Sequence, residues 1–148
     1  MNTDLAYATV GELSAALNRR KVSAVELTDA AIARIEKYDG AINAVVVRDF
    51  ERAREAAKRA DGEREKDVAK PLLGIPMTVK EANNVAGLKT TWGVPGFRDV
   101  VASDDGVAIK RLKDAGVIIL GKVGAAPASG DPHQRTNSYG YGYGMRLG

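Results

Sequence analysis

The amino-acid sequence predicts an α/β fold, in which an N-terminal helical hairpin precedes the first βαβ unit of a mixed sheet. Two observations lead to this prediction. Apolar residues recur at steps of three and four within residues 10–35, which is the period of a helix. Farther along, two short apolar runs, 72–79 and 117–120, flank a segment with helical period. Strand, helix and strand in this order indicate two parallel strands.

Each helix of the hairpin begins with a capping box, in which a hydroxyl residue and a glutamate three positions later bind each other's backbone amides. The boxes pair Thr9 with Glu12 and Ser23 with Glu26. The apolar stripes that follow are Val10, Leu13 and Leu17 in the first helix and Leu27, Ala31 and Ile35 in the second. Asp39 and Gly40 are expected to end the second helix.

A short strand and a third helix follow the hairpin. Residues 42–47 read INAVVV, and their β-branched side chains favour an extended strand. Asp49 can cap the next helix. The narrow apolar face of that helix consists of Phe50, Ala53, Ala57 and Ala60. The polar residues 61–70 are expected to form an exposed loop.

The first strand of the βαβ unit, residues 72–79, ends on Lys80 and turns at once into an irregular loop. A strand that presents one lysine in this way is typical of a functional side chain on a rigid scaffold. In the loop, Asn83, Asn84, Thr90 and Thr91 are turn formers, and Trp92 is expected to pack beneath the loop.

The unit continues with a helix that Ser103 or Asp104 can cap. Gly116 is placed to end this helix in the left-handed conformation. Residues 117–120 read VIIL, the continuous apolar run expected of a strand buried on both faces.

Residues 71–93 read PLLGIPMTVKEANNVAGLKTTWG, and this stretch resembles the N-terminal part of the amidase signature family. The similarity rests on G-I-P-x-x-V-K followed by V-A-G-x-x-T-T-x-G, and extends more loosely from Asp4 to Lys122. The resemblance implies the first part of the mixed amidase-signature sheet. It also implies a serine hydrolase that cleaves small-molecule carboxylic amides with a Ser–cis-Ser–Lys triad, in which Lys80 is the catalytic lysine. It implies no cofactor and no metal, and it leaves the substrate-binding residues unknown.

A lysine can accept a proton only if its ammonium form is destabilised, and burial away from water does this. Lys80 is therefore expected to be buried at the inner end of its strand, facing a cleft beside the loop that ends at Gly93. Without the resemblance, Lys80 would be one of 22 basic residues, most of them solvated.

The serine-bearing loop of the family, G-G-S-S-G-G-S, is absent from the 148 residues. Ser129 and Ser138 lack the required neighbours, and Val123-Gly124 stands where the family continues with Thr-Asn. We therefore expect a truncated chain, inactive alone. Residues 1–122 would be the N-terminal part of an amidase domain, and residues 123–148 a low-complexity, disordered tail. The missing strands would leave an uncovered sheet edge around residues 117–120, which predicts self-association.

Composition excludes several other classes of protein. The chain has 45% hydrophobic and 28% charged residues, as in an ordinary globular protein, and no cysteine. Its net charge of +3 is spread among interspersed acids and bases, which argues against nucleic-acid binding. The sequence shows no signal peptide, membrane span, dinucleotide fingerprint or metal-ligand cluster. We expect a cytoplasmic protein.

Two alternatives to the amidase interpretation stay open: a non-catalytic interaction or scaffold fragment, and the remnant of an A-type amidotransferase subunit.

Overall fold

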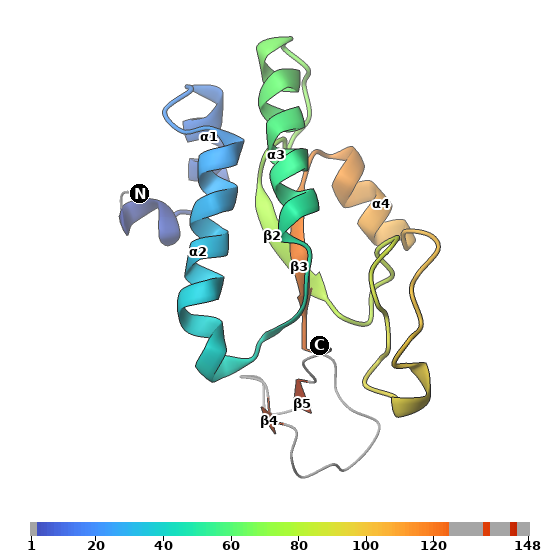
Figure 1. The fold of residues 1–148 in the computed structure, drawn as a ribbon. Helices are drawn as coiled ribbons and strands as arrows, with labels where there is room; N and C mark the ends of the chain where they lie inside the picture. The colour runs from blue at the N-terminus through green and yellow to red at the C-terminus, as the bar shows by residue number, and fades with distance from the viewer. Residues whose placement is uncertain (1–2, 125–134, 137–142, 145–148) are drawn as a thin grey trace.

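The computed structural model describes residues 3–124, 135–136 and 143–144, which form an α/β fold with a small mixed sheet (Figure 1). The elements, in order, are the 3-10 helix η1 (Thr3–Ala6), α1 (Val10–Asn18), α2 (Ala24–Ile42), β1 (Val45–Arg48), α3 (Phe50–Glu65), β2 (Pro76–Lys80), the 3-10 helix η2 (Pro95–Phe97), α4 (Val107–Asp114), β3 (Ile118–Val123), β4 (Arg135–Thr136) and β5 (Tyr143–Gly144). The predicted fold class is confirmed.

Both predicted capping boxes are present at the starts of α1 and α2. The Thr9 amide donates to Glu12 Oε2 at 2.7 Å, and the Glu12 amide donates to Thr9 Oγ1 at 3.3 Å. The corresponding distances between Ser23 and Glu26 are 2.8 and 3.0 Å. These bonds satisfy the backbone amides that each helix start would otherwise leave unpaired.

The prediction that Asp39 and Gly40 end the second helix is wrong, because α2 continues through Ile42. Asn43 takes the left-handed conformation that ends the helix, with φ of 54°. The buried Asp39 carboxylate instead accepts from the amides of Ala44 and Val45 at 2.6 and 3.1 Å. Asp39 therefore joins the helix end to β1, which begins at Val45 rather than at residue 42.

The predicted loop at residues 61–70 is also partly wrong, since α3 extends to Glu65. Asp61 explains the extension. Its carboxylate accepts from the amides of Ala24 and Val25 at 2.7 and 3.2 Å, so it caps the start of α2 from the side. The end of α3 is thereby fixed against α2. The predicted alanine face of α3 is confirmed, because Ala53, Ala57 and Ala60 are all buried.

The helix of the βαβ unit begins later than expected, with Gly106 as its N-cap in place of Ser103 or Asp104. The neighbouring acid, Asp105, is used elsewhere: it accepts from the Ala86 amide at 2.8 Å and binds Lys113 at 2.7 Å. Gly116 has the predicted left-handed conformation, with φ of 95°.

Strand β3 is the centre of the sheet, whose order is β1-β3-β2. Strands β2 and β3 are parallel, as predicted for the βαβ unit, and β1 is antiparallel to β3. The edge expected at residues 117–120 is therefore misplaced, because β1 and β2 form the edges of the described sheet. This segment is nonetheless buried on both faces, with Ile118, Ile119 and Leu120 at most 7% exposed.

The expected tail at residues 123–148 lies mostly outside the described residues. Val123 is the last residue of β3, and the Gly124 amide donates to Ala44 O at 2.9 Å. Beyond them only the short strands β4 and β5 are described, and they pair antiparallel.

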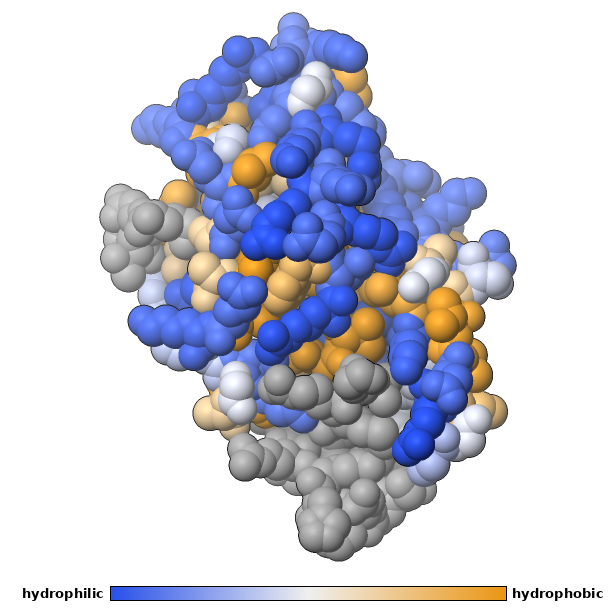
Figure 2. Space-filling view, viewed as in Figure 1, coloured by the Kyte–Doolittle hydropathy of each residue, from blue (hydrophilic) through white to orange (hydrophobic). Residues whose placement is uncertain are grey.

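Two apolar clusters cover the two faces of the sheet. The larger joins α1, α2 and α3 to Ile118 and Leu120 of β3. The smaller joins Val79 of β2 and Ile119 of β3 to Ile109 of α4. Figure 2 shows mainly hydrophilic side chains over α2 and α3 and hydrophobic ones gathered over the middle of the molecule. The fold thus has a helix layer on each side of β3, and both parallel strands end at the same edge.

Candidate functional site

Lys80 is the last residue of β2. Strands β2 and β3 are parallel and have their carboxyl ends at the same edge of the sheet (Figure 1). This edge is where open α/β sheets place ligands and catalytic groups. The turn that follows is tight, because the Asn83 amide donates to Lys80 O at 3.0 Å. Lys80 therefore ends its strand, as the sequence predicts.

The expectation that Lys80 is buried is wrong, because its side chain is exposed. The cause is the alternation of side chains along β2. Its neighbours Val79 and Glu81 are 5% and 1% exposed, and Val79 packs on Ile109 of α4. Lys80 consequently points away from the α4 layer and is exposed at the end of the strand.

Glu81, directly after Lys80, is a buried carboxylate that accepts hydrogen bonds from the loop beside it. Its Oε1 accepts from the Thr91 amide at 2.5 Å, and its Oε2 accepts from the Trp92 amide at 3.0 Å. The Thr91 hydroxyl also donates to Oε1, at 3.2 Å. The carboxylate is thus satisfied by backbone and hydroxyl donors, as a buried charge requires.

Lys122 lies beside Glu81 and is fully buried, with 0% exposure. Its ammonium donates to Lys89 O at 2.6 Å and to Thr90 Oγ1 at 2.7 Å. Glu81 Oε1 lies 3.9 Å from its Nζ. Burial lowers the pKa of Lys122 from 10.5 to about 8, and the charge of Glu81 opposes the shift. We call these two residues, with loop 89–93, the Glu81–Lys122 cluster.

The Thr90 hydroxyl and the Lys122 amine have the atoms of a nucleophile and a base, but substrate has no access to them. A hydroxyl 2.7 Å from a lysine amine can in principle be activated. Thr90 and Lys122 are only 5% and 0% exposed, however, so no substrate can reach them. Sequence reasoning did not identify this cluster. The one available signal was that charged residues follow each apolar run, Lys80 and Glu81 after 72–79 and Lys122 after 117–120.

Trp92 does not pack beneath the loop as expected, since it is 58% exposed. Its φ of 54° is left-handed, which is unusual for a tryptophan. Thr90 and Thr91, predicted as turn formers, are instead buried members of the cluster. Other exposed apolar residues of this loop are Phe97, Val100 and Val101.

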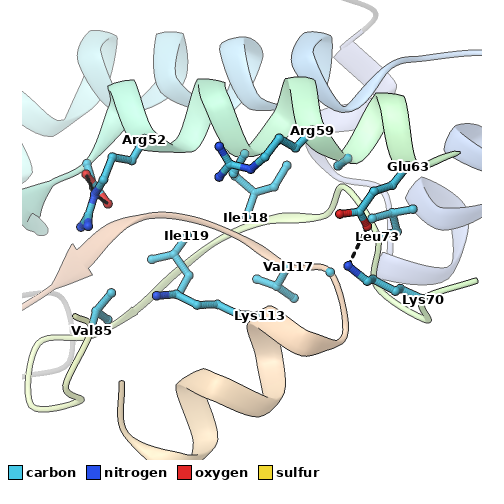
Figure 3. A pocket seen from close by; sticks show the side chains of 14 residues that line it. Arg52, Arg59, Glu63, Lys70, Leu73, Val85, Lys113, Val117, Ile118 and Ile119 are labelled. Carbon is cyan, nitrogen blue, oxygen red and sulfur yellow. Dashed lines mark hydrogen bonds and ion pairs between the residues drawn. The ribbon is translucent and has the colours of Figure 1, made fainter. Parts of the chain in front are cut away.

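A separate cleft of about 300 Å³ opens between α3 and α4, beside β3 (Figure 3). Arg52 and Arg59 from α3 and Lys113 from α4 line it, over Val117 and Ile119. Most of its cations are already paired. Lys113 binds Asp105 at 2.7 Å, Arg52 binds Asp49 at 2.8 Å, and Lys70 binds Glu63 at 2.6 Å. Lys80 does not line this cleft.

Within residues 3–124, 135–136 and 143–144, no group of three His, Cys, Asp or Glu side chains could hold a metal ion. In the same residues, no helix has the length and hydropathy needed to cross a membrane.

Comparison with known proteins shows the family. The model of the family described as Amidase matches residues 26–131. The chain is 39% identical over 121 residues to the A-type subunit of glutamyl-tRNA(Gln) amidotransferase from Moorella thermoacetica, with 81% of this chain and 25% of that protein covered. The corresponding protein of an Azoarcus strain is 41% identical over 115 residues, with 78% of this chain and 24% of that protein covered.

Solved structures agree. The native peptide amidase of Stenotrophomonas maltophilia superposes with a TM-score of 0.75 and 30% identity, covering 80% of this chain and 25% of that one. A chain of an inhibitor-bound vestigial protein complex, linked to the evolutionary origins of an s-triazine catabolic enzyme, superposes with a TM-score of 0.79 and 31% identity. This match covers 91% of the present chain and 30% of that one. The chain thus spans about a quarter of the length of the relatives it matches. On the family match and these likenesses, it belongs to the amidase family.

Proposed function

We propose that this chain supplies the lysine of an amidase site, and that Lys80 serves as the base in hydrolysis of a carboxylic amide C–N bond. The observation that carries the proposal is the position of Lys80: the G-I-P-x-x-V-K pattern ends at the carboxyl edge of the parallel strands. The substrate would be a small-molecule amide.

The proposal assigns the serines to a segment outside these 148 residues, because they contain no G-G-S-S-G-G-S stretch. Lys80 is exposed, so hydroxyls from such a segment can approach it. The same segment would exclude water from the lysine, which is the condition for a neutral amine to act as base. The chain alone would therefore have essentially no turnover.

A hybrid enzyme tests this proposal. Residues 3–124 would replace the matching quarter of the Moorella thermoacetica relative, and hydrolysis of an aryl amide would be measured. We expect turnover in the hybrid, and a loss of about a thousandfold or more with Lys80→Ala. Lys58→Ala, which removes an exposed lysine of α3, is the matched control and should leave turnover unchanged. Full activity of the Lys80→Ala hybrid would refute the role of Lys80.

Two alternatives accompany this proposal. The names of the relatives favour the remnant of an A-type amidotransferase subunit. A correctly folded hybrid with no turnover would instead favour a non-catalytic interaction module.

A further inference from the structure

We propose that Glu81 and Lys122 are positioning residues for Lys80, which lock loop 89–93 onto the strand ends and so fix the backbone that carries the lysine. The importance of Lys80 rests on the proposed function. The locking itself is a property of the chain as it stands and can be measured without activity.

Glu81 and Lys122 connect three segments that are distant in sequence. Lys122 lies in β3 opposite Val79 of β2, and the Glu81 amide donates to Val123 O at 2.8 Å. From these two strands, the carboxylate reaches the amides of Thr91 and Trp92, and the ammonium reaches Lys89 O and Thr90 Oγ1. The loop is thus held at four consecutive residues by two buried charges of opposite sign.

Loop 89–93 has a conformation that it would not keep alone. Trp92 and Gly93 both have positive φ, 54° and 71°. A left-handed tryptophan is strained, and such strain persists only where surrounding contacts over-determine it. The bond from the Trp92 amide to Glu81 Oε2 is such a contact. The carboxylate therefore selects this loop conformation.

The two neighbours of Lys80 in sequence, Val79 and Glu81, are both buried. Glu81 is held through both its backbone and its side chain. Lys80 therefore projects from a main chain that is fixed on both sides, as a functional residue requires. A buried ion pair is costly in stability compared with apolar residues, so its use here favours a specific geometric role.

The experiment uses the 148-residue chain and three variants: Glu81→Gln, Lys122→Met and a matched control, Asp39→Asn. Asp39 is also a buried carboxylate that accepts from two backbone amides and faces a cation, Arg48, but it lies at the end of α2. Amide hydrogen exchange is read at Thr91 and Trp92, and the backbone order parameter is read at Lys80.

We expect exchange at Thr91 and Trp92 to become at least about tenfold faster in Glu81→Gln and Lys122→Met, with the amides of α3 unchanged. The order parameter of Lys80 should fall from about 0.85 towards 0.6. Asp39→Asn should change neither readout. Unchanged exchange and order in the cluster variants, or equal changes in the control, would overturn the proposal.

The hybrid enzyme separates this proposal from the proposed function. In an active hybrid, Glu81→Gln and Lys122→Met should lower kcat at least about tenfold while KM stays within about twofold, because the loss is one of geometry. An active hybrid whose variants keep their kcat would overturn positioning. An inactive hybrid would count against the proposed function. Amide exchange and the order parameter, measured on the 148-residue chain alone, would still show whether Glu81 and Lys122 lock the loop.

Discussion

The buried ammonium of Lys122 makes the free energy of unfolding depend on pH. Burial lowers its pKa from 10.5 to about 8 in the folded chain, and unfolding restores the ordinary value. Below pH 8 both states are protonated, and the folded state carries the full cost of the buried charge. Between about pH 8 and 10.5 only the unfolded state retains the proton, so stability should rise with pH by up to about 1.4 kcal/mol per unit.

Urea denaturation at pH 7.5, 8.5 and 9.5 tests this prediction. Lys122→Met has no group to titrate at this position and should lack the rise, so the free energy of unfolding of the wild type should increase relative to that of the variant as pH increases. Lys58→Ala is the matched control, because Lys58 is exposed on α3. Parallel pH profiles of the wild type and Lys122→Met would show that the folded chain keeps Lys122 in an ordinary environment.

The two strand-end lysines show what a sequence can and cannot predict about a site. Lys80 is recognisable because fixed residues around it form a pattern, yet its exposure depends on neighbours that the pattern does not specify. Lys122 has the burial that was expected of Lys80. Its partners Lys89 and Thr90 are more than thirty residues away, and no local pattern places them together.

At the scale of elements, Gly121 of β3 pairs with Arg48 of β1 and borders the irregularity in the ladder between β2 and β3. Gly121 has a φ of 150°, and a Cβ there would lie 2.2 Å from Val47 O. Backbone of both strands would have to move to admit a side chain. We therefore expect Gly121→Ala to lower the free energy of unfolding by about 3 kcal/mol or more.

Gly62→Ala provides the contrast within the same fold. Gly62 lies inside α3, and a Cβ there would meet nothing within 4 Å. This variant should stabilise the chain by about 0.5–1 kcal/mol, because alanine is the better helix former. Both values can be read from urea denaturation at constant pH. Equal effects of the two substitutions would contradict the close approach at Gly121.

The type of an element could be predicted where one pattern in the sequence was enough. The end of an element could be predicted where the residue that binds it lies nearby in the chain. The capping boxes fixed the starts of α1 and α2 because both partners lie within four residues. The ends of α2 and α3 differ from the prediction because Asp39 and Asp61 serve neighbouring elements through tertiary bonds. The central position of β3 in the sheet could not be predicted either, because it depends on pairing with β1, which lies far from β3 in the sequence.

For the whole molecule, the two faces of the sheet differ in how many apolar residues are buried against them. Among the described residues, the cluster under α1, α2 and α3 has twelve buried members, and the one under α4 has six. Both layers use β3, but only the larger is closed by two long helices packed on each other (Figure 1). Local opening should therefore begin in the α4 layer, which has fewer apolar contacts to lose.

Matched cavities in the two layers test this order of opening. Ile32 of α2 and Ile109 of α4 are 0% and 2% exposed, so truncation of either to alanine should cost about 2–5 kcal/mol. Ile109→Ala should speed amide exchange in α4 and the loop before it while α2 and α3 stay protected. Ile32→Ala should weaken protection throughout, because the larger layer supports β3 and β3 in turn supports α4. If Ile109→Ala accelerated exchange in α2 and α3 as much as in α4, the two layers would have to unfold as a single unit, and the carboxyl edge that carries Lys80 could not open on its own.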